Sequence, residues 1–181
     1  MGVHFTVVVD HDLRDTRLEA VRACFQPLQA CFDEISAYLD GGAPLERWQD
    51  VSKPGSVRSY HFYAPADSSV MIGAAALRFH HCIRFSAFIE DMAIRDLFRR
   101  FSLRLALLFG QRQALYAPCE GIGDEIADWL LEDLSLAAIL SRPYQRANPA
   151  VTIDALAVCS SPEQRYYVDG FEDIVPSRES S

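Results

Sequence analysis

Two aspartates that flank a histidine are the first residues with a recognisable chemistry. Asp10, His11 and Asp12 follow directly on the apolar run VVV. A strand that ends in two carboxylates can hold a magnesium ion, because hard cations prefer oxygen ligands. The same region can equally mark the start of a helix that Asp12 or Asp15 caps, since an aspartate side chain accepts hydrogen bonds from the free N–H groups of a first turn.

A later acidic segment bears on the magnesium hypothesis. The segment GDEIAD, residues 123–128, supplies Asp124 and Asp128. Together with VVVDHD it partly resembles the haloacid-dehalogenase-type phosphatases. In these enzymes a first aspartate attacks phosphorus, a second is the acid/base, and a later acidic motif holds magnesium. The resemblance implies Asp10 as nucleophile, Asp12 as acid/base, and Asp124 and Asp128 on the metal.

Three features oppose the phosphatase hypothesis. The position where that family has threonine or valine is Arg14, and the segment CEGI before Gly123 is too short and polar to be a buried strand. The only lysine is Lys53, which lies too early in the chain to screen the charges of aspartate and phosphate. Short motif matches are often fortuitous. We therefore interpret the DHD segment as a capping segment and keep a magnesium-dependent phosphatase as the alternative.

Other reactive side chains give no recognisable site. In the segment His80-His81-Cys82, neighbouring residues of a strand point to opposite faces, which disfavours one shared metal ion. Cys119 lies in a strand-to-helix turn, but a Cys-x₅-Arg phosphate loop would need arginine where the chain has Glu125. There is no phosphate-binding glycine loop and no Gly-x-Ser-x-Gly elbow. We predict no catalytic residue, no metal and no cofactor.

Two clusters of acidic and aromatic residues remain as candidates for binding a partner. No basic residue lies between Glu120 and Asp133, and two tyrosines precede a second acidic cluster. Such clusters can steer and anchor a basic protein, although a solvated helix face with a core tryptophan gives the same pattern. The predicted partner-binding residues are Asp124, Glu125, Asp128, Trp129, Glu132 and Asp133 in the first cluster, and Tyr166, Tyr167, Asp169, Glu172 and Asp173 in the second.

Composition limits the class of protein. The chain has 181 residues, of which 50% are hydrophobic, and a net charge of −8. The acidic balance argues against nucleic acid or an anionic membrane as the main partner. Five cysteines without a Cys-x-x-Cys pair suggest reduced thiols in a cytoplasmic protein. We expect no signal peptide and no membrane span, and one globular domain over 1–174 with a disordered tail at 175–181.

The hydrophobic pattern predicts the elements that position these residues. Alternation predicts a strand at 3–9, and a one-sided apolar stripe predicts a helix from 18 to 39 that Pro27 kinks or splits. A loop follows at 43–56. The remaining predicted elements are strands at 57–63 and 82–89, a helix from 91 to 109, a strand at 113–118, two short helices over 123–143, and strands at 151–158 and 165–168. We expect Asp133 or Ser135 to cap the second of the two short helices. Residues 68–81 fit either a strand or a short helix.

This order predicts an α+β fold with helices packed on an antiparallel or mixed sheet. The first six elements are compatible with a ferredoxin-like β-α-β-β-α-β core, which a C-terminal extension of helices and strands would follow.

The C-terminal part of the chain, with its YYVDGFEDI segment at 166–174, resembles bacterial polymorphic-toxin immunity proteins. The resemblance covers the C-terminal third and the general make-up, and it implies a cytoplasmic protein that binds and inhibits a cognate, basic toxin domain. A non-catalytic regulatory subunit is a further alternative. The identity of the partner and the oligomeric state stay open.

Overall fold

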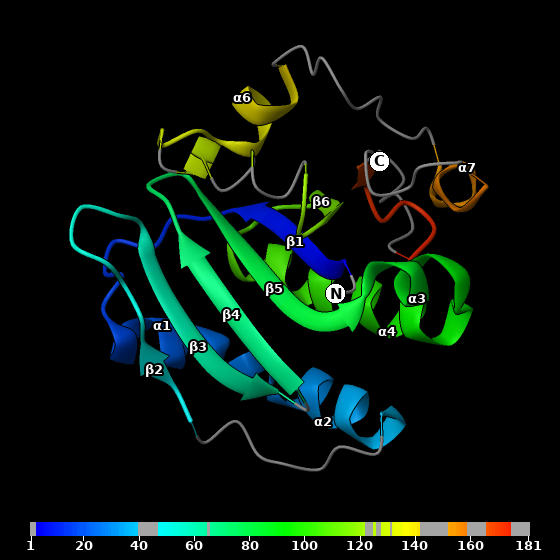
Figure 1. Cartoon of the computed structure of the whole chain (residues 1–181), viewed down its shortest axis with the longest axis horizontal. Coiled ribbons are helices and arrows are strands. Elements are labelled where there is room, and N and C mark those ends of the chain that lie inside the picture. Colours follow the sequence, from blue (N-terminus) through cyan, green and yellow to red (C-terminus); the bar gives the residue numbers. More distant parts are fainter. Residues whose placement is uncertain are drawn as a thin grey trace, which may run out of the picture.

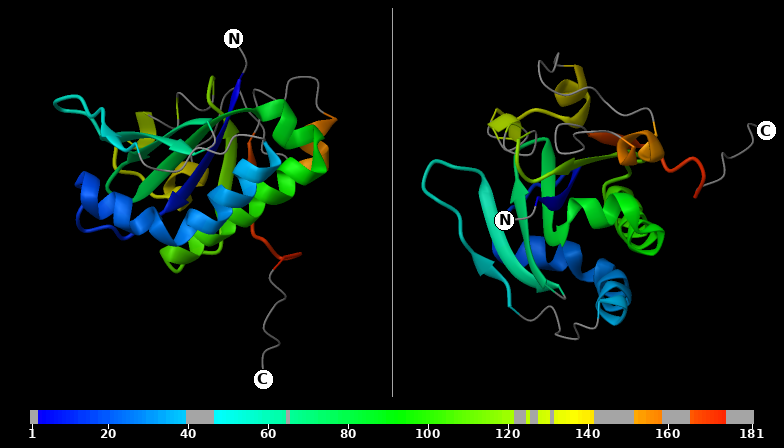
Figure 2. Two further views of the ribbon diagram at one scale, coloured as in Figure 1. Left: turned by 90° about the horizontal axis from the view of Figure 1, so that it is seen from below. Right: turned by 45° about the vertical axis from the view of Figure 1, so that its right-hand side comes forward.

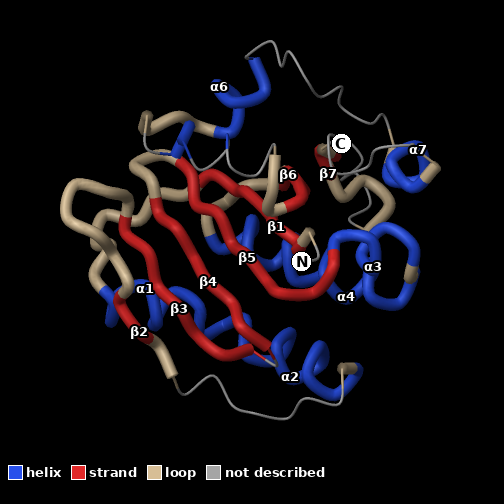
Figure 3. The backbone as a smooth tube through the Cα atoms, in the orientation of Figure 1, coloured by secondary structure: helices blue, strands red, loops and turns tan. Residues whose placement is uncertain are grey.

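A sheet of seven strands organises the protein. The computed structural model describes residues 3–39, 47–64, 66–121, 125, 128–130, 132–141, 152–158 and 166–174. The strands lie in the order β2-β3-β4-β5-β1-β6-β7, and every neighbouring pair is antiparallel (Figure 3). Their bounds are β1 His4–Asp10, β2 Gln49–Asp50, β3 Arg58–Ala64, β4 Ala66–Ile72, β5 Ala76–Arg84, β6 Ala114–Pro118 and β7 Tyr167–Asp169.

The long helices lie together against one side of the sheet, while α6 lies on the other side (Figures 1 and 2). The helical segments are α1 Leu18–Phe25, the 3₁₀ turn η1 Gln26–Leu28, α2 Gln29–Tyr38, α3 Phe85–Glu90, α4 Met92–Leu108, α6 Leu136–Ser141 and α7 Ile153–Ala157. The predicted α+β class is therefore confirmed.

The central strand β1 contributes to two hydrophobic cores. Its alternating side chains place Phe5, Val7 and Val9 in the main core beneath the long helices. Val8 points to the opposite face and joins a smaller core that α6 covers. Because strand residues alternate between faces, His4 and Thr6 share the face of Val8.

Pro27 divides the first helical segment, as predicted. The residues on either side are α-helical, and Pro27 lies in the 3₁₀ turn between them. Proline has no N–H to donate, and its ring clashes with the preceding turn of an α-helix. The chain therefore tightens for one turn and then resumes, which keeps the apolar stripe on the core side.

The prediction of a helix from 91 to 109 is confirmed by α4. The carboxylate of Asp91 caps this helix by accepting hydrogen bonds from the N–H groups of Ala93, at 2.9 Å, and Ile94, at 3.2 Å. Ser135 likewise accepts a bond from Ala138 N–H near the start of α6, at 3.2 Å, as the cap prediction for that segment required.

Two predicted strands are wrong. The segment 82–89 contains the end of β5 and then α3, whose buried residues Phe85, Phe88 and Ile89 follow helical spacing rather than alternation. The segment 151–158 contains α7, which Thr152 caps through a bond from Ala155 N–H at 3.0 Å. In both cases a short apolar pattern fits either period.

The remaining predictions differ in smaller ways. The segment 68–81, for which the sequence allowed a strand or a short helix, consists of most of β4, a turn at Gly73 and the first part of β5. The predicted loop at 43–56 contains the short β2. These additional strands lie between α2 and α3, so the element order is longer than β-α-β-β-α-β. The ferredoxin-like comparison therefore stays a prediction. The predicted tail at 175–181 lies outside the described residues.

Candidate functional site

Hydrogen bonds of Asp10 and His11 join the end of β1 to residues that are distant in the sequence. Asp10 Oδ1 accepts a hydrogen bond from the N–H of Leu136, the first residue of α6, at 2.5 Å. His11 Nδ1 accepts from Leu13 N–H at 3.0 Å, so its Nε2 carries the proton and donates to the Gly73 carbonyl at 2.8 Å. The segment therefore does supply a helix cap, but the capping residue is Asp10 and the capped helix is α6, not the helix that follows in sequence.

The helix that follows, α1, begins without a side-chain cap. Its N-cap residue is Arg17, and no side chain accepts a bond from the first turn. Asp15, which we expected as one of two caps, instead pairs with the Arg17 guanidinium at 2.7 Å. This pairing lowers the pKa of Asp15 to about 2. The expected cap by Asp12 or Asp15 is therefore wrong.

Among the described residues, the carboxylates of the magnesium hypothesis do not form a common site. Within the described part of the chain, the only group of three or more metal-ligating side chains consists of His4, His80 and Cys119. Asp12 and Asp128 are exposed, and Asp10 is bound to α6. Asp124 lies outside the described residues. The arrangement gives no support to a magnesium-dependent phosphatase.

Three described members of the first acidic cluster lie on one side of a short helical segment before α6. Glu125, Asp128 and Glu132 are exposed and follow one another at steps of three and four residues, which places them on the same side of a helix. The Glu132 N–H donates to the Asp128 carbonyl at 3.1 Å, which confirms the helical path. Leu130 is fully buried in the smaller core and holds this turn against the sheet.

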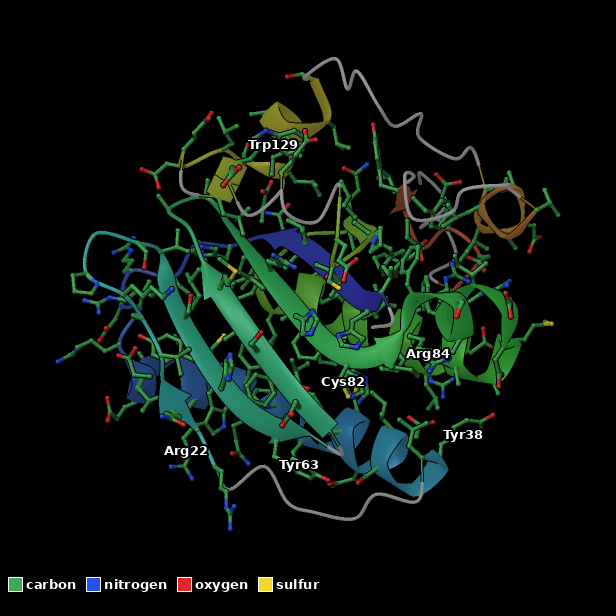
Figure 4. The ribbon with its side chains drawn as sticks, viewed as in Figure 1. Arg22, Tyr38, Tyr63, Cys82, Arg84 and Trp129 are labelled. Carbon is green, nitrogen blue, oxygen red and sulfur yellow. The ribbon has the colours of Figure 1, made fainter. Side chains whose placement is uncertain are left out.

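Trp129 and Asp133 border the same turn. Trp129 packs half-buried against the smaller core and lies next to α6 (Figure 4). Asp133 adopts a positive φ of 59°, and its Oδ1 accepts a bond from Ala74 N–H at 3.3 Å. The β4–β5 turn therefore supports this segment. It also approaches closely at Gly73, where a Cβ atom would lie 2.7 Å from the Leu130 carbonyl oxygen.

A surface hollow lies beside this turn. Its volume is about 360 Å³, and Asp133 forms part of its wall. Its other lining residues include Ser56 in the loop before β3, Arg58 at the start of β3, and Gly73. We call Glu125, Asp128, Trp129, Glu132 and Asp133, together with this hollow, the acidic surface.

The second acidic cluster is largely a structural network. Asp169 is 1% exposed and Arg99 is 9% exposed. The Arg99 guanidinium donates to both oxygens of Asp169, at 2.7 and 3.1 Å, and also to Asp173, at 2.7 and 2.9 Å. Asp169 also accepts hydrogen bonds from Tyr116 Oη, at 3.1 Å, and from Phe171 N–H, at 2.9 Å. Burial, and then the nearby Asp169 charge, raises the pKa of Tyr116.

Two residues of the second cluster do not fit the surface that we predicted. Tyr166 is 8% exposed and packs in the smaller core, and Asp169 is enclosed with Arg99. Tyr167 is half-buried and stacks on Tyr116 with ring centroids 6.0 Å apart. Glu172 and Asp173 are exposed, although Asp173 is held by Arg99. The aromatic and acidic residues at 166–173 therefore owe part of their pattern to packing inside the protein, where Asp169 pairs with Arg99 of α4.

Three metal-ligating side chains meet at the opposite end of β1. His4 begins β1, His80 lies on β5 and Cys119 follows β6, and their ligand atoms all lie within 4.8 Å of one another. Each residue is half-buried. The two imidazole rings meet edge to face, with centroids 5.4 Å apart. Sequence reasoning missed this cluster because its members are far apart in the chain and only the strand order joins them.

The histidines at 80 and 81 have separate environments, as their alternation predicted. His81 is buried on the helix side, where its ring meets Phe98 edge to face at 5.0 Å. Its Nδ1 accepts a bond from Ile83 N–H at 3.0 Å. On the other face, burial, and then the positive charge of Arg78, lowers the pKa of His80 to about 4.

Comparisons with known proteins add no functional assignment. No protein-family model matches the chain, and neither curated proteins nor solved structures give a significant match. No helix among the described residues combines the length and the apolar character needed to cross a membrane. Function therefore has to be argued from the side chains themselves.

Proposed function

We propose that this protein binds a basic protein partner through the acidic surface. The observation that carries the proposal is the placement of Glu125, Asp128 and Glu132 on one exposed side of a turn that Leu130 anchors in the core. A turn fixed in this way presents its charges in a constant arrangement. This turn then loses little conformational entropy when a partner binds.

The charge of the whole chain supports the same partner class. The net charge is −8, so the long-range field also attracts a cationic protein. Charges at the rim of an interface mainly raise the association rate and select the partner. We therefore expect association to weaken as salt is added, because a Debye length of about 10 Å at 0.1 M screens such charges.

Affinity needs contacts that exclude water, and two features beside the acids support these. Trp129 combines a packed indole with partial exposure, which suits an interface anchor. Asp133 is one of the residues that line the adjoining hollow of about 360 Å³. A lysine or arginine side chain of the partner could enter this hollow and pair with Asp133.

Within this class we infer an inhibitor of the immunity type that neutralises a toxin domain. The inference is supported by the acidic composition and by the resemblance of the C-terminal segment to such proteins. A regulatory subunit would use the same surface on a different partner. The identity of the captured protein separates these two cases.

Capture from the native cell lysate tests the proposal when matched baits are compared. The test bait carries Glu125→Lys, Asp128→Lys and Glu132→Lys. The control bait carries the same change of charge at the exposed residues Glu19, Asp67 and Glu90, which lie on other elements. We expect the wild-type and control baits to retain one basic protein near one-to-one, and the test bait to lose it. Equal retention by all three baits would show that the acidic surface is not the interface.

A further inference from the structure

We propose that His4, His80 and Cys119 form a binding site for a zinc ion. The three side chains come from β1, β5 and the residue after β6, which are adjacent in the sheet. The proposal is independent of the acidic surface, because this cluster lies at the opposite end of β1. It also departs from the expectation from sequence that the chain holds no metal.

The donor set is suited to zinc. Imidazole nitrogen and thiolate sulfur are its usual protein ligands, at about 2.0–2.1 Å and about 2.3 Å. In a tetrahedron, these bond lengths place ligand atoms roughly 3.5 Å apart. The three ligand atoms already lie within 4.8 Å of one another. Small side-chain rotations would therefore bring them into range without moving the strands.

The backbone already holds Cys119 beside His4. The His4 N–H donates to Cys119 Sγ at 3.0 Å, and the Cys119 N–H donates to the His4 carbonyl at 2.9 Å. The first of these bonds aims a donor at the sulfur and fixes its position. The pairing therefore holds the Cys119 side chain next to His4.

A buried hydroxyl on the same face is the second observation that points to a ligand. Thr6 is fully buried and lies directly opposite His80 in the β1–β5 register. Its Oγ1 has no hydrogen-bond partner among the described residues. A buried polar atom without a partner is rare and often marks the place of an ion or water. We infer that Thr6 holds the water that completes a three-ligand zinc site.

Zinc is the ion to which we commit, although softer ions share these donors. Copper sites with two histidines and one cysteine need a particular trigonal geometry with a weak axial ligand. Zinc accepts the three donors together with a water and imposes no such geometry. Because the ligands come from β1, β5 and the residue after β6, the ion would hold the His4 end of the sheet together, and the melting temperature should rise with zinc concentration.

Cobalt spectroscopy of the reduced protein tests the site directly. We expect Co²⁺ to give tetrahedral visible absorption with a thiolate-to-cobalt charge-transfer band at one equivalent, and Zn²⁺ to bleach both. Cys119→Ser should abolish the charge-transfer band. His80→Gln should weaken binding by about 100-fold or more, since the loss of an outer-shell partner alone costs about 10–100-fold.

The matched controls are Cys82→Ser and His61→Gln, which remove the same side chains outside the cluster and should leave both spectrum and affinity unchanged. Absence of a charge-transfer band in the wild type, or its survival in Cys119→Ser, would overturn the proposal.

Thiol protection in the wild-type protein avoids any dependence on the folding of the variants. Iodoacetamide labelling, followed by peptide mapping, measures the reaction rate of each cysteine with and without Zn²⁺. We expect Zn²⁺ to slow the labelling of Cys119 at least tenfold and to leave Cys82 unaffected. An equal rate at Cys119 with and without Zn²⁺ would contradict the site even if every variant misfolded.

Discussion

Changing Asp169 to asparagine should strongly destabilise the protein. Asp169 accepts two hydrogen bonds from Arg99, one from Tyr116 and one from the N–H of Phe171. An asparagine side chain at this position would have no charge and would offer one acceptor oxygen where the carboxylate has two. The Arg99 guanidinium would then lose its buried counter-charge, and Arg99 and Tyr116 would share one acceptor oxygen in place of two.

The size of the effect follows from burial. Removing one partner of a buried ion pair costs about 3–5 kcal/mol. Because Arg99 would keep Asp173, whose side chain is 66% exposed, we expect the lower end of this range. The matched control is Asp173→Asn, which removes an exposed partner of the same arginine. It should cost no more than about 1 kcal/mol.

Urea denaturation followed by circular dichroism measures both variants. At an m-value of about 2 kcal/mol/M, a loss of about 3 kcal/mol lowers the midpoint by about 1.5 M. Asp173→Asn should lower it by no more than about 0.5 M. If the two variants have the same midpoint, the network does not tie β7 to α4, and the burial of Asp169 has no energetic consequence.

Three further predictions concern the ends of β1 and the turn beneath the acidic surface. Without metal, His80 should destabilise the fold progressively as the pH falls from about 6.5 to about 4, because the unfolded chain binds its proton first. The loss should reach at most about 3 kcal/mol, and His80→Gln should remove this part of the pH dependence in urea melts. Asp10→Ala should cost about 1–2 kcal/mol by uncapping α6, whereas Asp12→Ala, at an exposed carboxylate, should be neutral in the same assay. Gly73→Ala should lower the melting temperature, because the Cβ atom of the alanine would lie 2.7 Å from the Leu130 carbonyl oxygen. An unchanged melting temperature would mean that the segment around Leu130 moves away freely.

The sequence predicts the main elements of the fold where one hydrophobic period dominates. The long stripe of α4 and the alternation of β1 are unambiguous, and Pro27 acts locally. Short apolar segments are different. The residues of α3 satisfy both periods over a few positions, and packing against α4 decides in favour of the helix.

The candidate sites differ in how far sequence can predict them. The acidic surface consists of residues close together in the chain, so a charge pattern was enough to suggest it. The role of Asp169 depends on Arg99, which is seventy positions away in the sequence. No local sequence pattern indicates that the two residues pair. The same holds for His4, His80 and Cys119, which only the strand order β5-β1-β6 brings together.

The affinity of the captured partner for matched variants is the most direct test of the proposed function. Titration calorimetry at low and at physiological salt would compare the wild type with the Glu125→Lys, Asp128→Lys, Glu132→Lys variant and the control at Glu19, Asp67 and Glu90. Exposed ion pairs contribute up to about 1 kcal/mol each, so three reversals should weaken binding by about 100-fold. We predict this loss at low salt, a smaller loss at physiological salt, and a control close to the wild type. An unchanged Kd for the reversed variant would contradict the acidic surface as the binding site.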